Sequence, residues 1–435
     1  MKRELRIFAV IAGAFLFAYL VPFSNPTVRS AIMEAFHMLQ EYAREHVLLC
    51  LVPAFFIAGA IAVFISQASV IKYLGGKAKK VVAYGVGAVS GAILAVCSCT
   101  VLPLFAGIYK RGAGLGPAIA FLYSGPAINV LAIILTGRIL GIEFGLARAL
   151  GAIVFAVVIG LAMQFLFRKE EAEKQEAAMA APVVEDGRPI WKTAIPVALM
   201  ILILVFANWG KPGSLSVETT ADGTIVATRA GETSDELLVK LPGSDVVTSI
   251  AKDEIASIRY APAPYTSIYG SRFYIAGAFL LVLVVLMIRW YSKEEALQWG
   301  GSTWSYAKLI LPYLFGGVLI AGFLLGQPGH TALIPPEWIA NAVGGNSWLS
   351  NLMASLAGAL MYFATLTELP IVQGLQGLGM GDGPALALLL AGPALSLPNM
   401  LVIRKVLGTK KTLAYVLLVV IAATLTGKLF GAIVG

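Results

Sequence analysis

Stretches of about 20 consecutive apolar residues recur along nearly the whole chain, and they restrict its fold more than any other feature. A helix of that length crosses the roughly 30 Å hydrocarbon core of a lipid bilayer. Hydrophobic residues make up 58% of the 435 residues and charged residues only 13%, whereas a soluble domain carries about 25% charged residues. The sequence therefore predicts an all-α polytopic membrane protein and argues against a soluble globular enzyme.

The apolar segments set the expected number of crossings. They cover 5–23, 47–66, 81–109, 113–136, 142–167, 190–208, 272–290, 306–326, 348–380, 383–403 and 412–434. As one helix, the segment 81–109 would be about 44 Å long, too long for an upright crossing, and it is interrupted between Cys97 and Pro103. We expect a re-entrant hairpin there, and a second one in 348–380.

Basic residues fix the expected orientation. Lys80 precedes the first hairpin and Lys110 follows it, and positive loops face the cytoplasm. With this hairpin, most Lys and Arg runs between segments fall on the cytoplasmic side. The net charge of +8 then reports membrane orientation and not a nucleic-acid partner. The prediction is about nine transmembrane helices and two re-entrant hairpins in the cytoplasmic (inner) membrane, with the N-terminus inside.

An internal repeat is visible in the prolines. Pro103, the pair Gly116-Pro117 and the pair Gly125-Pro126 recur as Pro370, Gly383-Pro384 and Gly392-Pro393, with one constant offset in the numbering. The same offset relates Thr100 to Thr367. In the expected topology the two copies enter from opposite faces, which is the inverted repeat of secondary transporters with a solute site near the midplane.

Polar residues at the two interruptions are the candidate solute contacts. Around the first interruption they are Cys97, Ser98, Cys99, Thr100 and Pro103, and around the second Thr367, Glu368 and Pro370. Interrupted helices leave backbone groups without partners, which is tolerated only inside protein or beside a water-filled cavity. Thiolates favour thiophilic species. A carboxylate at this depth is a functional candidate, so Glu368 is the expected carrier of a coupling proton, unless the second tip lies nearer the surface and Glu368 is hydrated.

Further polar residues follow the Gly-Pro pairs. Ser124, Asn129 and Asn399 are candidates for hydrogen bonds to a solute, although each Asn could equally satisfy backbone groups freed by a neighbouring proline. Arg148 lies about two turns from the end of its segment, so its guanidinium is expected to snorkel to the interface and is not a predicted ligand.

Metal, nucleotide and cofactor sites are not expected. The three histidines, His37, His46 and His330, lie outside the core segments, and a structural zinc site needs four ligands. Glycine-rich stretches such as 112–116 lack the Walker pattern. The sequence therefore predicts a protein that is not an enzyme, without metal or cofactor.

Between the two halves the composition becomes polar. Residues 211–271 contain alternating strand-like runs with an Asp-Gly turn at 222–223, which predicts a small extracytoplasmic β insert. The expected domains are membrane repeat A over 1–168, a cytoplasmic linker over 169–189, a linking transmembrane helix over 190–210, the insert over 211–271 and membrane repeat B over 272–435.

Three runs carry a family resemblance: 97–103 with its two cysteines, the Gly-rich run ending at Pro117, and 124–129 from Ser124 to Asn129. They resemble the bacterial predicted-permease family that includes the organoarsenical efflux permeases (ArsP-like and YraQ-like proteins). The resemblance covers roughly 45–165 and 300–435 and leaves out the insert. It implies export of small toxic species, trivalent organoarsenicals in one branch, with Cys97 and Cys99 as the arsenic contacts.

The function predicted from these features is a secondary-transporter-type permease that moves a small thiophilic or anionic solute outward. Its expected partners are a small-molecule substrate and the lipid bilayer, and both a homo-oligomer and a partner docked on the β insert are compatible with the sequence. One alternative is a membrane thiol-disulfide relay, which the second repeat disfavours because Ala364 and Leu366 stand where the first has cysteines. A passive channel is the other.

Overall fold

The computed structural model describes residues 22–64, 78–94, 98–128, 130–180, 190–209, 264–326, 342–361 and 368–434, most of 212–262 and a few isolated positions. The chain divides into two compact units. One comprises Met1–Pro189 with Lys293–Gly435, and the other comprises Ile190–Ser292. The first unit is helical, and the second contains two helices and a β-sheet.

The chain is a multi-pass membrane protein. Among the described residues, five helices are long and apolar enough to cross a bilayer: Val47–Phe64, Ile142–Leu166, Pro264–Trp290, Lys293–Leu325 and Thr409–Ile433. They overlap the predicted segments at 47–66, 142–167, 272–290, 306–326 and 412–434, although the third and fourth helices begin well before the predicted 272 and 306. The predicted first helix over 5–23 lies mostly outside the described residues.

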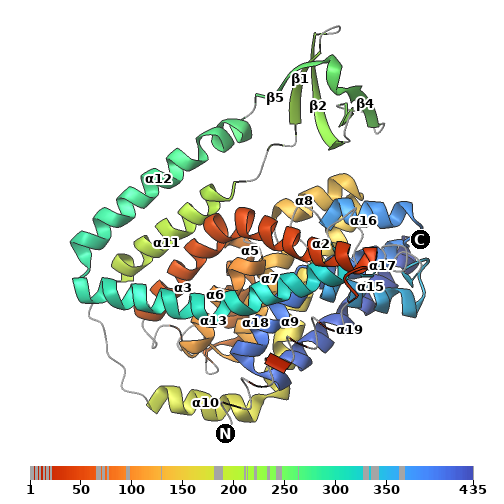
Figure 1. Cartoon of the computed structure of the whole chain (residues 1–435). Helices are drawn as coiled ribbons and strands as arrows, with labels where there is room; N and C mark the ends of the chain where they lie inside the picture. Colours follow the sequence, from red (N-terminus) through yellow and green to blue (C-terminus); the bar gives the residue numbers. More distant parts are fainter. Residues whose placement is uncertain are drawn as a thin grey trace. The chain divides into compact units, whose positions relative to one another are not determined.

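A long N-terminal helical path packs against one very long helix. The path runs through α2 (Pro26–Tyr42), the π-helix η1 (Ala43–Leu51) and α3 (Val52–Phe64), and both α2 and α3 contact α13 (Lys293–Leu325) (Figure 1). Close approach depends on small residues, since a Cβ on Gly322 of α13 would lie 2.8 Å from the Cα of Ala35. The N-terminal segment is therefore joined to the second half of the chain.

Two series of five helices follow the same plan. The first consists of α5 (Lys80–Leu94), α6 (Ser98–Lys110), α7 (Leu115–Ala127), α8 (Val130–Ile139) and α9 (Ile142–Leu166). The second consists of α15 (Trp348–Leu360), α16 (Glu368–Gly377), α17 (Asp382–Ala391), α18 (Leu397–Leu407) and α19 (Thr409–Ile433). The offset of the proline repeat also carries the first residues of α7, α8 and α9 onto the first residues of α17, α18 and α19.

The two series also pack alike. α7 contacts α5 and α9, and α17 contacts α15 and α19 in the same way. In the first series a Cβ on Gly160 would stand 2.7 Å from the carbonyl oxygen of Gly116, and in the second a Cβ on Gly427 would stand 2.5 Å from that of Gly383. The repeat offset relates the first glycine pair to the second, so the repeat in sequence is a repeat in helix packing.

The structure corrects two predicted crossings. The segments 113–136 and 383–403 were each expected to be one helix, but each forms two short helices, α7 with α8 and α17 with α18. The first pair is interrupted after Ala127, and the second over 392–396, where the non-glycine residue Ser396 has a φ of 38°. Pro126 and Pro393 remove backbone donors at these points, which favours a break in the helix.

The first predicted interruption, between Cys97 and Pro103, is helical from Ser98 onward. α5 ends at Leu94 and α6 begins at Ser98, so that Pro103 lies inside α6. The ring of a proline clashes with the carbonyl four residues earlier, here that of Cys99 in the first turn, where the helix has only begun. Pro370 likewise sits in the first turn of α16, where its missing N–H has no helical partner to lose.

The second unit is a pair of helices joined through a small sheet. α11 (Ile190–Ala207) contacts α12 (Pro264–Trp290), and aromatic pairs join them near both ends. Trp191 and Trp290 meet with ring centroids 5.2 Å apart at one end, and Trp209 and Tyr265 meet at 5.4 Å at the other.

The structure confirms a small β-sheet in the predicted insert, although 264–271 belong to α12 and not to the sheet. The sheet is antiparallel with the order β4-β3-β2-β1-β5, where the strands are β1 (Ser214–Thr219), β2 (Gly223–Glu232), β3 (Glu236–Lys240), β4 (Val247–Ala251) and β5 (Ile255–Tyr260). Alternate residues of β1 point to one face, and Leu215 and Val217 are buried there with Leu237 and Val239 of β3. Period-two alternation in the sequence therefore became a one-sided apolar core.

The glycine contact between α17 and α19 gives the first testable prediction. Gly427→Ala should lower the free energy of unfolding by about 1–3 kcal/mol, because backbone atoms of the neighbouring helix must move to admit a methyl group. Gly316→Ala is the matched control, since a Cβ there meets no atom within 4 Å. The measurement is the thermal unfolding midpoint of both purified variants, and an equal midpoint for Gly427→Ala and the control would contradict the assigned packing.

Candidate functional site

A buried ion pair joins the two helix series. Arg148 of α9 donates from Nη2 to Oε1 of Glu368 at 2.6 Å, and the two side chains are 0% and 1% exposed. Arg148 also donates from Nη1 to Oγ1 of Thr136 on α8 at 2.9 Å. Thr136 in turn donates to the carbonyl of Ala132. The guanidinium is therefore held by one neutral and one acidic acceptor from different helices.

Arg148 was expected to snorkel to the membrane interface, and that expectation is wrong. Its side chain is completely buried, because Glu368 lies within reach and supplies a counter-charge. A buried arginine with a carboxylate partner avoids the large cost of an isolated charge in a low-dielectric environment. Glu368 itself lies at the predicted interruption, as the first residue of α16, and its burial argues against the alternative that it is simply hydrated.

The first interruption is contacted by a cysteine that the sequence did not single out. Cys50 Sγ lies 2.6 Å from Oγ1 of Thr100, and both residues are buried. Cys50 belongs to the π-helix η1, a distortion that is frequent at functional sites. Because the two residues lie far apart along the chain, no local signal in the sequence pointed to their contact.

Several predicted site residues lie outside what the structure describes. Cys97, Asn129 and Thr367 are not described, and for Ser98, Cys99 and Pro370 only the helical backbone is. Pro103 and Ser124 are buried, and Ser124 donates to the carbonyls of Phe121 and Gly87. Their roles toward a solute stay predictions.

The break between α17 and α18 holds a further polar residue. Ser396 is 2% exposed, and its hydroxyl has no hydrogen-bond partner among the described residues. Three residues later, the predicted candidate Asn399 is 3% exposed in the first turn of α18. The repeat could have found Ser396, because its offset maps Asn129, the candidate in the first series, onto this position.

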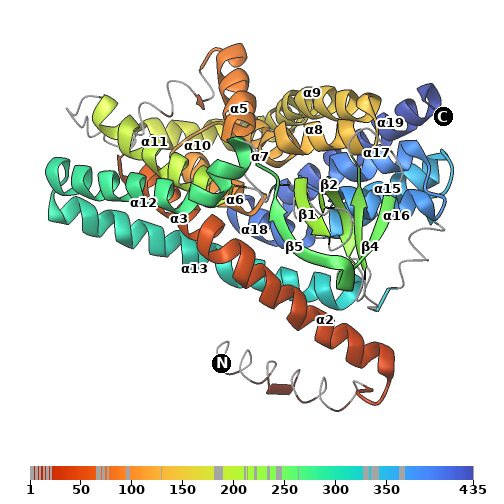
Figure 2. The same cartoon turned by 90° about the horizontal axis from the view of Figure 1, so that it is seen from above.

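The helices that follow the two predicted interruptions, α6 and α16, each contact the opposite series. α6 packs against α18, and α16 packs against α8. Each contact therefore joins the second helix of one series to the fourth helix of the other. Tyr123 Oη donates to the carbonyl oxygen of Leu390 at 3.2 Å, and these two positions are themselves related by the repeat offset. The packing of the two series against each other is therefore reciprocal. Figure 2 shows α8 and α9 side by side, with α17 and α19 next to them.

A second charged cluster ties α10 (Arg168–Ala180) to both series. Glu171 Oε1 accepts from Nζ of Lys411 at 2.7 Å and from Oη of Tyr109 at 2.8 Å. The ammonium of Lys174 lies 3.1 Å from the centroid of the Tyr109 ring, and burial lowers the pKa of Lys174 to about 8. α10 thus connects the end of α6 with the start of α19.

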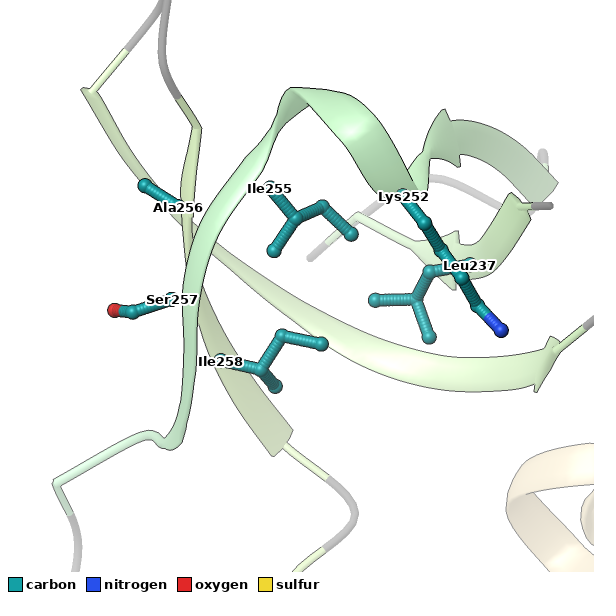
Figure 3. Close-up of a pocket in the computed structure, with 6 residues that line it drawn as sticks. All are labelled: Leu237, Lys252, Ile255, Ala256, Ser257 and Ile258. Atoms are coloured by element: carbon teal, nitrogen blue, oxygen red, sulfur yellow. The ribbon is translucent and has the colours of Figure 1, made fainter.

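The described part of the chain contains no group of three or more His, Cys, Asp and Glu residues able to hold a metal ion. In the second unit a hollow is lined by Leu237, Lys252, Ile255, Ala256, Ser257 and Ile258 (Figure 3). Leu237 belongs to the apolar core of the sheet and Ile255 packs against it, and no predicted site residue lines the hollow. The hollow is therefore an edge of the apolar core of the sheet.

The ion pair gives the second prediction. Arg148→Met should lower the free energy of unfolding by about 3–5 kcal/mol, because it leaves a buried carboxylate without its partner. The double variant Arg148→Met/Glu368→Met should lose less than the two single variants together. Glu143→Gln, an exposed carboxyl on the same helix, is the control and should change stability by less than about 0.5 kcal/mol. Thermal or denaturant unfolding measures all four, and strictly additive losses would contradict direct pairing.

Comparison with known proteins identifies the family of the chain. The chain matches the predicted-permease family ArsP_1 over residues 32–432. It is 41% identical to the UPF0718 protein MJ0584 of Methanocaldococcus jannaschii over 393 residues, covering 90% of this chain and 94% of that protein. It is also 34% identical to the UPF0718 protein YraQ of Escherichia coli over 113 residues, covering 26% of this chain and 30% of that protein. No solved structure matches the chain. The protein belongs to the ArsP_1 family of predicted permeases.

Proposed function

We propose that the protein is a secondary-transporter-type permease that moves a small thiophilic or anionic solute across the cytoplasmic membrane, in the direction of efflux. The observation that supports this most directly is the pair of matched, interrupted helix series with buried polar side chains at their interruptions. Discontinuous helices of this kind bind solutes in transporters built from inverted repeats.

The proposed topology has the N-terminus inside and the two hairpins entering from opposite faces. It includes nine crossings, two of them through the paired short helices α7–α8 and α17–α18, a cytoplasmic segment over 169–189 and an extracytoplasmic β insert between α11 and α12. The membrane repeats over 1–168 and 272–435, with the linking helix over 190–210, would then move against each other during alternating access. A homo-oligomer and a partner docked on the β insert belong to the same proposal.

The proposed solute site lies between the first turns of α6 and α16 and the opposite short helices α18 and α8. Its first half comprises Cys97, Ser98, Cys99, Thr100 and Pro103, together with Ser124 and Asn129. Its second half comprises Thr367, Glu368, Pro370 and Asn399. The hydrogen bond between Cys50 and Thr100 adds a third thiol beside the first half.

Glu368 is the proposed carrier of a coupling proton. Its carboxylate is the counter-charge of Arg148 on the opposite series. Protonation would remove that charge and weaken the attachment of α16 to α9, since the attraction between the two groups depends on both being ionised. Proton transfer and movement of one repeat would thereby be linked through a single bond.

The cysteine role is tested by binding. Cys97→Ala/Cys99→Ala should abolish tight binding of phenylarsine oxide, because trivalent arsenic prefers thiolate ligands. The matched control is Ser271→Ala, an exposed position on α12 that leaves all three thiols in place. The readout is the thermal unfolding midpoint with and without the arsenical, and a shift that persists unchanged in the double variant would contradict the proposal.

The proton role is tested by transport. In inside-out vesicles, Glu368→Gln should remove the dependence of methylarsenite accumulation on an imposed pH gradient, because glutamine cannot carry the proton. Glu143→Gln should retain that dependence. A Glu368→Gln protein that still follows the gradient would rule out Glu368 as the coupling residue, and accumulation that never exceeds equilibrium even in the unmodified protein would favour a passive channel.

A further inference from the structure

Arg148 has hydrogen-bonding capacity that the described protein does not use. A guanidinium carries five N–H donors. One is directed at Thr136 and one at Glu368, while Nε has no partner among the described residues although the side chain is fully buried. Buried polar atoms are nearly always satisfied in folded proteins, so an unsatisfied donor on a permanently charged group marks a place where an acceptor is missing.

The two members of the ion pair are held very differently. Arg148 lies on α9, a helix of 25 residues that contacts α5, α7, α8, α17 and α19. Glu368 begins α16, a helix of 10 residues that contacts α17 and α8 and leaves Gln373 and Gly374 exposed. The cation therefore lies on a long helix with many helical neighbours, whereas the carboxylate lies in the first turn of a short helix with fewer.

We propose that Arg148 binds the anionic group of the transported solute and that Glu368 occupies this position when no solute is bound. The inference rests on the proposed permease function and names its substrate class: a small anion with two oxygens on one edge, such as a carboxylate or a sulfur oxyanion. Such an edge accepts two parallel hydrogen bonds from a guanidinium. It would replace the Glu368 carboxylate at Nη2 and reach the unused Nε.

Displacement of Glu368 by a solute anion would give the Arg148–Glu368 ion pair a role in transport in addition to stabilising the fold. A solute anion that replaces Glu368 keeps Arg148 neutralised, so the buried charge is never left uncompensated. It also releases α16 from α9, which joins solute binding to separation of the two series. The repeat offset maps Arg148 onto Tyr415 and Glu368 onto Val101, so the anion site is single although the backbone plan is repeated.

The test measures anion binding to the purified full-length chain without any transport step. Acetate and its uncharged analogue acetamide are the probes, in a buffer whose only other anion is bulky HEPES. Acetate should bind at least about tenfold more tightly to Glu368→Gln than to the unmodified protein, a difference of about 1.4 kcal/mol, because it no longer competes with a carboxylate. Acetamide should bind neither protein, and Arg148→Gln/Glu368→Gln should not bind acetate.

Glu143→Gln is the matched control, since it removes one exposed carboxylate from the same helix, and its acetate affinity should equal that of the unmodified protein. If Glu368→Gln does not fold, Glu368→Ala provides the second measurement, because it leaves an empty space beside Arg148. Acetate, but not acetamide, should then raise its unfolding midpoint toward that of the unmodified protein.

Acetate affinity of Glu368→Gln equal to that of Glu143→Gln, together with no acetate-specific stabilisation of Glu368→Ala, would overturn the anion site. That result would leave the permease proposal standing, because flux is not measured. Conversely, tight acetate binding by Glu368→Gln combined with absence of any solute flux in vesicles of the unmodified protein would overturn the permease proposal and retain the anion site.

Discussion

A positive charge that no solvent reaches is the constraint on which the rest of the membrane unit depends. The protein must surround the buried guanidinium of Arg148 with acceptors and one counter-charge. Glu368, far away in sequence, supplies that charge at 2.6 Å. The second helix series must therefore fold against the first, with α16 directed toward α9, before the charge is compensated.

Repetition of the backbone and difference in side chains have separate consequences. Matched glycines at 116, 160, 383 and 427 let two pairs of helices approach to backbone contact, and this sets the same frame in both series. The polar side chains beside these glycines differ between the two series. Tyr84 hydrogen-bonds Gln164 beside the first glycine pair, whereas Asn351 hydrogen-bonds Asn346 beside the second. A repeated frame with different side chains therefore gives the two series different chemistry at equivalent positions.

Charged contacts tie the two series together at two places. Arg148 with Glu368 joins them in the interior, and Lys411 with Glu171 joins them where α10 begins. Glu171 of α10 also accepts a hydrogen bond from Tyr109, which lies near the end of α6. A displacement of α6 would therefore also shift α10, because one carboxylate oxygen of Glu171 accepts from both Tyr109 and Lys411.

The sequence by itself determined the elements whose signals are local: long apolar helices, five strands with period-two alternation, and a repeat recorded in prolines and glycines. It placed Glu368 at an interruption for the same reason. The segments 113–136 and 383–403 were wrongly expected to be continuous helices. A proline is tolerated within membrane helices, and its sequence context does not show whether the helix breaks there. The ion pair of Arg148 with Glu368 and the contact of Cys50 with Thr100 were decided only by the tertiary structure. A side chain two turns from a helix end can reach either the interface or a buried partner, and the choice depends on whether a carboxylate distant in sequence comes close enough to neutralise it.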